Sequence, residues 1–255
     1  GYTQTYANVG ETSNIGVDIT LNTVNIRTRD FEWSTSLNVA WQKDKIEELA
    51  NGKEDDINNN WFIGKSLGVI YGYESAGIWQ EEDAAEMAEF NKKGHSFQVG
   101  MARPVDQNGD HKIDPNDDRI VVGHTRPRWT LGMTNTFSYK NFDFSVFFQG
   151  SANTSFWIDA NATAPFQDNT QLLKAYADSH WAEDHQDVYA VWPRLSRTKN
   201  VNNTVQSTWF MRDGAFMRLK QMEIGYTLPR KALNKMHLSN LRFYLSGNNL
   251  LKFSS

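Results

Sequence analysis

Hydrophobic and polar residues alternate with a period of two along several segments of the chain, as half-buried β-strands require. In residues 31–42, Trp33, Leu37 and Trp41 fall on one face, while Ser36 and Asn38 fall on the other. The same alternation recurs in residues 17–22, 131–139, 142–150, 221–228 and 241–246. The pattern therefore predicts an all-β chain whose antiparallel strands are apolar on one face only.

Short and long connections alternate between these strands. The short ones are residues 27–30, 140–141 and 229–240, and the long excursions are residues 43–128 and 151–208. Transmembrane β-barrels place short turns on the periplasmic side and long loops outside the cell. A soluble sandwich has no need to gather its long loops at one end, so the order of connections favours a barrel. Short helices are expected within the excursions at residues 81–93, ending at Gly94, and at residues 168–181.

Composition is consistent with this prediction. Hydrophobic residues make up 39% of the chain and aromatic residues 13%, which suits strands with one apolar face. The chain has no run of about 18 apolar residues, so no transmembrane helix is expected. The net charge is −4 and no basic stripe stands out, which argues against a nucleic-acid partner. Cysteine is absent, which excludes disulfides and thiolate chemistry.

An acidic run at residues 106–117 has the ligand spacing of a calcium loop. Oxygen ligands at alternating positions let a short loop surround one Ca²⁺. The predicted ligands, at loop positions 1, 3, 5, 7, 9 and 12, are Asp106, Asn108, Asp110, the carbonyl of Lys112, Asp114 and Asp117. His111 replaces the usual glycine, and Asp117 replaces a bidentate glutamate, so binding should be weakened. Two interpretations stay open: a structural Ca²⁺ site and a solvated acidic turn.

The tryptophans also admit two interpretations. Trp33, Trp41 and Trp129 lie at or near strand ends, where interfacial aromatic girdles occur. Four others in the excursions are candidate substrate contacts, because indole rings stack on sugar rings or contact peptides: Trp61, Trp79, Trp157 and Trp181. The same side chains equally suit anchors of loop folds or of a partner surface.

No catalytic constellation is expected. His180 and His185 are five residues apart, which does not align them on one helix face, and no third metal ligand is evident. Neighbouring carboxylates such as Glu81 and Glu82 point apart rather than forming an acid–base pair. Nucleophile elbows, phosphate loops and dinucleotide fingerprints are absent from the sequence. The chain is therefore not predicted to be an enzyme.

Five segments in colinear order carry a resemblance to a known family. They are WFIGKSLGVIYGYESAGIWQ (61–80), DQNGDHKIDPNDDRIVVG (106–123), NFDFSVFFQG (141–150), DGAFMRLKQMEIGYTLP (213–229) and LRFYLSGNNL (241–250). Together they resemble the C-terminal barrel portion of SusC/RagA-type TonB-linked outer-membrane transporters of Bacteroidota. The resemblance covers nearly the whole chain.

This resemblance implies a barrel of about 22 strands plugged by an N-terminal domain. Residues 1–255 would be its C-terminal portion, without the plug, the N-terminal barrel strands or the final strand. The family implies TonB-dependent import across the outer membrane, with TonB acting on the plug and a SusD-like surface lipoprotein as a lid. An oligomeric glycan is the expected substrate, and a peptide is the alternative.

Two other kinds of protein compete with this interpretation. One is a receptor-like barrel that binds a ligand without transporting it. The other is a soluble glycan-binding β domain or glycan-processing enzyme. Detergent-free monomeric behaviour would favour the soluble domain.

Overall fold

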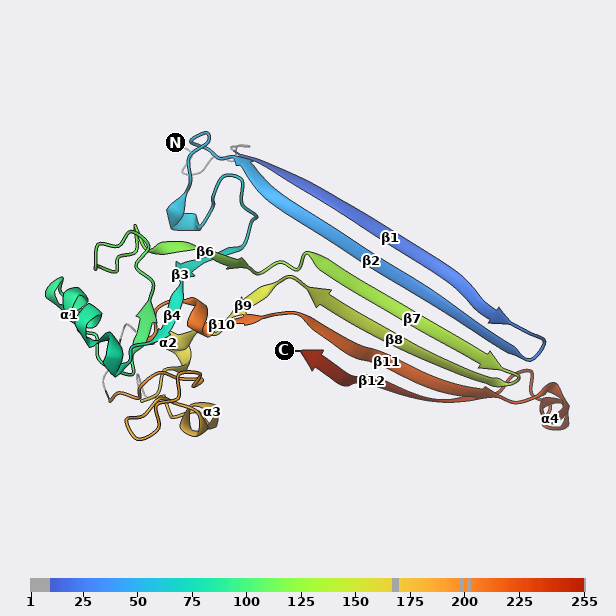
Figure 1. Ribbon diagram of the computed structural model, residues 1–255. Coiled ribbons are helices and arrows are strands. Elements are labelled where there is room, and N and C mark those ends of the chain that lie inside the picture. Colours follow the sequence, from blue (N-terminus) through green and yellow to red (C-terminus); the bar gives the residue numbers. More distant parts are fainter. Residues whose placement is uncertain (1–9, 167–169, 198–199, 201–202, 255) are drawn as a thin grey trace, which may run out of the picture. The chain divides into compact units, whose positions relative to one another are not determined.

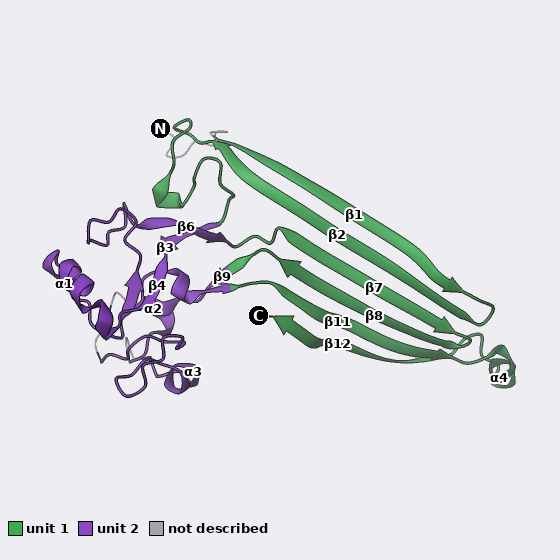
Figure 2. Ribbon diagram, viewed as in Figure 1, with its two compact units in different colours: residues 1–68, 125–155, 213–255 green, residues 69–124, 156–212 purple. Residues whose placement is uncertain are grey.

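The computed structural model describes residues 10–166, 170–197, 200 and 203–254. The chain divides into two compact units (Figure 2). Unit 1 comprises residues 1–68, 125–155 and 213–255, and unit 2 comprises residues 69–124 and 156–212. Among the described residues, no helix is both long and apolar enough to cross a membrane.

Unit 1 is built on one six-stranded antiparallel sheet (Figure 1). Its strands, in spatial order, are β1 (Glu11–Arg27), β2 (Phe31–Glu48), β7 (Trp129–Tyr139), β8 (Phe142–Ala152), β11 (Phe216–Thr227) and β12 (Arg242–Ser254). The predicted antiparallel β architecture is confirmed. The second strand is longer than its alternation suggested, because its register with β1 continues to Glu48.

The connections alternate as the sequence predicted. A tight turn at residues 28–30 joins β1 to β2, and Lys140 and Asn141 join β7 to β8. Lys140 takes a left-handed conformation (φ 52°), and its N–H donates to the carbonyl of Asp30. The third short connection contains α4 (Arg230–Lys235), and in Figure 1 it lies at the same end of the sheet as the two turns.

The sheet has two chemically different faces, which the register makes explicit. One row of paired residues across all six strands is apolar: Leu21, Leu37, Met133, Phe148, Leu219 and Leu251. The adjacent row, which points to the opposite side, is polar apart from one glycine: Thr20, Asn38, Gly132, Gln149, Arg218 and Lys252. These sides are called the apolar face and the polar face below. The apolar face is not covered within unit 1, since Val17 and Leu21 remain 55% and 51% exposed.

The chain between the second long excursion, which ends at residue 208, and the short connection at residues 229–240 is not one continuous strand. The chain forms a short strand β10 (Met211–Asp213) that pairs with β9 (Ser155–Trp157) before β11 begins. Between β10 and β11, the Asp213 carboxylate accepts the Ala215 N–H at 2.9 Å, and Gly214 donates to the Thr154 carbonyl. A second irregularity at Lys220 shifts the register of β11 against both neighbours.

Unit 2 holds the remaining short elements. Two-stranded ribbons pair β3 (Val69–Tyr73) with β6 (Arg119–His124), and β4 (Ser75–Ile78) with β5 (Ala102–Pro104). Its helical turns are η2 (Glu81–Asp83), α1 (Ala84–Lys92), α2 (Ala160–Thr163), α3 (Lys174–Asp178) and η4 (Thr208–Phe210), while η1 (Ile57–Asn59) belongs to unit 1.

Two aromatic clusters form the core of unit 2. The first consists of Trp79, Met87, Phe90 and Phe97. The second consists of Ala160, Ala164, Tyr176, Trp192 and Phe210.

Of the two predicted helices, the first is present and the second is much shorter than expected. Residues 81–92 are helical, which confirms the prediction to within one residue, and Gly94 follows with a φ of 101°. The prediction for residues 168–181 is wrong for the described part, because only α3 is helical; Asp168 lies outside the described residues. The helix ends at Ser179, whose carbonyl accepts the Trp192 N–H, and His180 then pairs with Trp192 as an isolated bridge.

Candidate functional site

The acidic run forms a loop that its own side chains close. Both oxygens of Asp106 accept backbone N–H groups, Oδ1 from Gly109 and Oδ2 from His111, each at 2.7 Å. His111 adopts the left-handed conformation that glycine usually takes, with a φ of 60°. The histidine therefore does not prevent the sharp turn, although it carries a backbone cost that glycine avoids.

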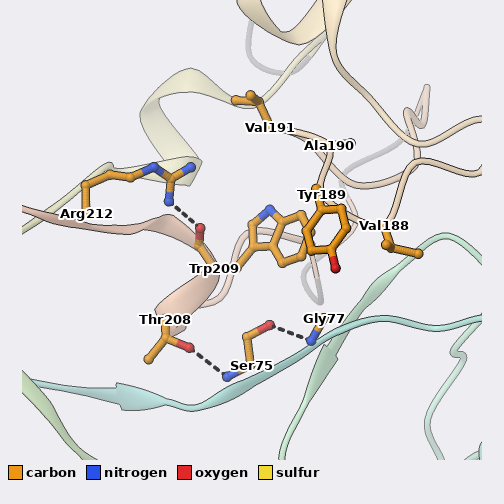
Figure 3. A pocket seen from close by; sticks show the side chains of 9 residues that line it. All are labelled: Ser75, Gly77, Val188, Tyr189, Ala190, Val191, Thr208, Trp209 and Arg212. Atoms are coloured by element: carbon orange, nitrogen blue, oxygen red, sulfur yellow. Dashed lines mark hydrogen bonds between the residues drawn. The ribbon is translucent and has the colours of Figure 1, made fainter. Parts of the chain in front are cut away.

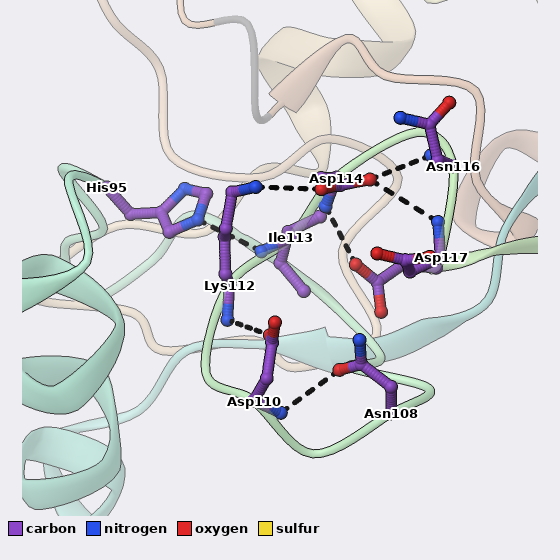
Figure 4. Close-up of polar contacts among 9 residues, drawn as sticks. His95, Asn108, Asp110, Lys112, Ile113, Asp114, Asn116 and Asp117 are labelled. Carbon is purple, nitrogen blue, oxygen red and sulfur yellow. Dashed lines mark hydrogen bonds and ion pairs between the residues drawn. The ribbon is translucent and has the colours of Figure 1, made fainter.

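The same kind of contact continues along the loop (Figure 4). Asn108 Oδ1 accepts the Asp110 N–H at 3.0 Å, and Asp110 Oδ1 accepts the Lys112 N–H at 2.8 Å. Asp114 Oδ1 accepts the Asn116 N–H at 2.8 Å, and its Oδ2 accepts the Lys112 ammonium at 2.8 Å. Lys112, followed by the Asn116 N–H, holds the pKa of Asp114 below its usual range.

Asp118, which the sequence interpretation passed over, closes the base of the loop. Its side chain is fully buried, and its oxygens accept the N–H groups of Gln107 at 2.8 Å and Asp114 at 2.7 Å. Asp117, the predicted final ligand, is exposed. The two aspartates are adjacent in sequence, so spacing alone did not reveal which one points inward.

The oxygen atoms of this loop have the chemistry that Ca²⁺ prefers. Within the described ranges, however, no three acidic or histidine side chains form a group that could hold a metal ion. The structure brings the predicted ligand positions into one loop, where their oxygens engage backbone N–H groups and Lys112. It does not bring them into one coordination sphere.

His95 ties this loop to the aromatic cluster of unit 2. Its Nε2 accepts the Ile113 N–H at 3.0 Å, and its ring stacks on Phe97 with centroids 4.9 Å apart. Burial lowers the pKa of His95, and the charge of Lys112 acts in the same direction. The neutral imidazole that results is the form that can accept this hydrogen bond.

The four candidate tryptophans are in different environments. Trp79 is fully buried against Phe90 and Phe97, with ring centroids 5.6 and 5.3 Å away. Trp181 is 1% exposed. The ring faces of these two belong to the core in this conformation, and their contact with substrate stays a prediction. Trp61 is 42% exposed and Trp157 is half-buried, so their substrate contacts stay predictions.

The pair His180 and His185 does not form a site. His180 Nδ1 lies 3.0 Å from the carbonyl oxygen of Tyr176, and His185 pairs with Ala182 through the backbone.

A pocket of about 420 Å³ in unit 2 is a second candidate site (Figure 3). Nine residues line it: Ser75, Gly77, Val188, Tyr189, Ala190, Val191, Thr208, Trp209 and Arg212. They come from three segments that are far apart in sequence. Tyr189 stands at the rim, 91% exposed, on a turn where the Asp187 carboxylate accepts the Tyr189 N–H at 2.9 Å.

Comparison with known proteins shows what the whole chain is similar to. No family model matches it. Two TonB-dependent receptors of Formosa agariphila are 28% and 29% identical to it, each over 100% of the chain and over 25% and 26% of the relative. The TonB-dependent receptor SusC of Bacteroides thetaiotaomicron is 25% identical over 86% of the chain and 21% of that relative. The chain is similar along its length to TonB-dependent receptors, SusC among them.

Solved structures share the fold. The RagAB peptide importer in its open-open state superposes with a TM-score of 0.75 at 22% identity, covering 98% of this chain and 26% of that one. Its closed-closed state gives a TM-score of 0.69 at 24% identity. The six-stranded sheet thus has the fold of a section of that importer. The predicted outer-membrane location is confirmed, since receptors of this kind are outer-membrane β-barrels.

The match covers only part of each receptor. The chain spans about a quarter of the length of the curated relatives it matches.

The pocket in unit 2 was not predicted from the sequence. The sequence signals available for it were Tyr189 and Trp209, two aromatic residues among several in the excursions.

Proposed function

We propose that the receptor containing this chain imports an oligomeric nutrient across the outer membrane in a TonB-dependent manner. The observation that carries the proposal is the paired register of the sheet, with an apolar row and a polar row crossing all six strands. An apolar side suits lipid and a polar side suits a hydrated lumen. The apolar face would contact outer-membrane lipid, and the polar face would line the substrate path.

The substrate we propose is a glycan, delivered by a SusD-like lipoprotein that covers the barrel. TonB would act through a plug domain, so no catalytic residue is assigned to this chain. Exposed Trp61 and half-buried Trp157 remain candidate substrate contacts. Peptide import is the alternative, favoured by the fold shared with the RagAB peptide importer. A glycan-binding β domain that does not transport is a further alternative.

Uptake by cells tests this proposal directly. The complete receptor gene would be deleted and restored in cells with and without a functional TonB complex. Fluorescent oligosaccharides and fluorescent oligopeptides would then be supplied separately. Oligosaccharide accumulation that needs both the receptor and TonB is expected. Accumulation of peptides alone would favour the alternative, and surface binding without TonB-dependent accumulation would contradict import.

We also propose that the loop at residues 106–117 binds Ca²⁺ as a structural brace. Asp106, Asn108 and Asp110 would supply side-chain oxygens, Lys112 its carbonyl, and Asp114 and Asp117 the remaining carboxylates. The support is the chemistry of these groups and the left-handed turn at His111. The bound ion would neutralise the negative charge of the loop and stiffen it.

Calorimetry of the intact receptor with Ca²⁺ tests the cation site. The double variant Asp106→Ala plus Asp110→Ala should lose the binding heat. A control, Asp178→Ala plus Asp184→Ala, removes two exposed carboxylates elsewhere in unit 2 and should leave the heat unchanged. Equal heats for the first double variant and the unmodified receptor would overturn the proposal.

A further inference from the structure

The polar side chains of the unit 2 pocket offer hydrogen-bond donors to a ligand. Its nine lining residues include no aspartate, glutamate, asparagine or glutamine. Ser75 Oγ accepts the Gly77 N–H at 3.1 Å, and Thr208 Oγ1 accepts the Ser75 N–H at 2.9 Å (Figure 3). Each hydroxyl therefore keeps its own proton as a donor. A ligand in this pocket must supply most of the acceptors.

Arg212 places a positive charge at the wall of the pocket. Its Nη1 donates to the carbonyls of Trp209 at 2.7 Å and Met211 at 2.9 Å, which fixes the guanidinium against the backbone. The Nη2 and Nε groups are left as donors. Among the described residues Arg212 makes no ion pair, so no neighbouring carboxylate neutralises it. A fixed guanidinium without an anionic partner is well suited to a carboxylate or sulfate of a ligand.

The other walls supply flat and apolar surface. Tyr189 is 91% exposed on a turn held by Asp187, so its ring is presented to solvent rather than to the core. Trp209, Val188 and Val191 add further apolar lining. Gly77 has a φ of 97° and no atom within 4 Å of a Cβ built on it, so the part of the pocket beside Gly77 is open space. Aromatic faces of this kind stack on the C–H faces of sugar rings.

We propose that this pocket binds an acidic sugar unit, a uronate within an oligosaccharide, with its carboxylate on Arg212 and its ring against Tyr189. The proposal rests on the proposed import of glycans and narrows the substrate to anionic ones. Sugar hydroxyls both donate and accept, so they satisfy the donor-rich lining. A peptide presents backbone N–H groups that need acceptors, and the lining side chains offer only the Tyr189 hydroxyl and the two hydroxyls already accepting N–H groups.

Binding of matched saccharides to the purified full-length receptor tests the site. The first probe is a tetrasaccharide of galacturonic acid, and the second is the same tetrasaccharide with its carboxylates reduced to alcohols. Calorimetry should show the acidic probe binding at least about tenfold more tightly, as a charge-assisted hydrogen bond provides. Arg212→Gln should remove that preference, and Arg212→Lys should keep part of it. Tyr189→Ala should weaken both probes, since it removes the stacking surface.

Controls separate the pocket from general charge and from folding. Lys174→Gln removes one positive charge from unit 2 outside the pocket, where Lys174 pairs with Asp178, and should leave both affinities unchanged. Because Arg212 also holds backbone carbonyls, the Arg212 variants are compared with the unmodified receptor by circular dichroism and by heat-modifiable gel mobility. Tyr189→Ala, at an exposed rim position, tests the site independently of that backbone role.

Several results would overturn the proposal. Equal affinities for the two tetrasaccharides, absence of binding, or an Arg212→Gln receptor that still prefers the acidic probe would each do so. Displacement of the acidic probe by a tetrapeptide with a free carboxyl terminus, but not by its amide, would assign the pocket to peptides instead. Loss of import with uronate binding intact would count against the proposed transport alone. TonB-dependent import of neutral glycans without any Arg212 effect would count against the pocket alone.

Discussion

Arg242 on β12 reaches past β11 to Asp143 on β8, and it does so over Gly225. Arg242 Nε lies 3.2 Å from Asp143 Oδ1, while its Nη2 contacts Asp143 Oδ2 and lies 2.7 Å from Glu223 Oε1. The register places Gly225 directly opposite Asp143. A Cβ at position 225 would lie 2.4 Å from Arg242 Nη2 and 2.6 Å from Asp143 Oδ2. The missing side chain lets one guanidinium tie three strands together.

Gly225→Ala should therefore weaken the barrel wall. The added methyl group must displace Arg242 or Asp143, which are 33% and 37% exposed, so solvent screening keeps the loss of stability small. Urea unfolding of the full-length receptor in detergent measures the change. Gly132→Ala on the same face is the control, because its Cβ would meet only the Phe147 ring at 3.5 Å. Equal losses in the two variants would show that Arg242 does not depend on Gly225.

The contact between His95 and Ile113 should make the acidic loop sensitive to pH. The pKa of His95 is lowered below 6.5 by burial and by Lys112, with Asp118 opposing, so the folded protein favours the neutral ring. The stability that the neutral His95 ring contributes is fully present above about pH 6.5. It is lost as the pH falls from there through the lowered pKa of His95. Amide hydrogen exchange at Ile113, corrected for the intrinsic rate, should be faster at pH 5 than at pH 7.5.

His95→Phe provides the comparison for this pH effect. The phenyl ring keeps the stacking surface against Phe97 but accepts no hydrogen bond from Ile113. Exchange at Ile113 should then be fast at both pH values. A pH effect of unchanged size in the variant would mean that another group causes it.

The sheet could be predicted from the sequence because its two faces have different chemical surroundings, and the alternation of apolar and polar residues follows from that difference. Leu37 and Asn38 are neighbours in sequence and point to opposite faces, so a period of two records the apolar and polar sides of one wall. The turn at Lys140 and Asn141 followed from the same pattern, since the alternation stops and restarts around two residues. The left-handed conformation of Lys140 was not visible in the sequence.

The sites could not be predicted to the same degree, because they depend on packing within unit 2. Trp61 and Trp79 look alike as tryptophans in one excursion, yet one is 42% exposed and the other is fully buried. Burial was decided by Phe90 and Phe97, which spacing does not connect to Trp79. Tyr189 and Arg212 are 23 positions apart by their numbers, and both line one pocket only after the chain folds.

The core position of Trp79 predicts a structural rather than a binding phenotype. Trp79→Ala should destabilise unit 2 by about 3–5 kcal/mol, the usual cost of removing a large buried aromatic side chain. Trp61→Ala, at an exposed position in unit 1, should cost little. Limited trypsin digestion of the full-length receptor compares the two, with faster cleavage within residues 69–124 expected for Trp79→Ala alone. Resistance equal to that of the unmodified receptor would contradict the core assignment.

Lys112 should compete with a bound cation for Asp114. Its ammonium lies 2.8 Å from Asp114 Oδ2, whereas the proposed ligand from this residue is its backbone carbonyl. Lys112→Met keeps that carbonyl and removes the competitor, so Ca²⁺ affinity should rise by up to about fivefold, the range of an exposed ion pair. Lys174→Met, which breaks the ion pair with Asp178, is the matched control. An unchanged or weaker Ca²⁺ affinity for Lys112→Met would mean that Asp114 is not a ligand.

Asn135 is a polar residue on the apolar face, and the hydrogen bonds that its side chain accepts should stabilise it in that position. Its Oδ1 accepts from Trp33 Nε1 at 3.0 Å and from Thr35 Oγ1 at 2.7 Å, and Asn25 Nδ2 donates to Thr35 Oγ1 at 2.7 Å. Asn135→Leu leaves both donors without this acceptor, which should cost about 1–3 kcal/mol if lipid covers them. Urea unfolding in lipid vesicles measures the loss, and Met133→Leu in the neighbouring apolar row should cost little. A stabilised Asn135→Leu receptor would mean that water reaches this row, which would place it at the membrane interface rather than in the hydrocarbon.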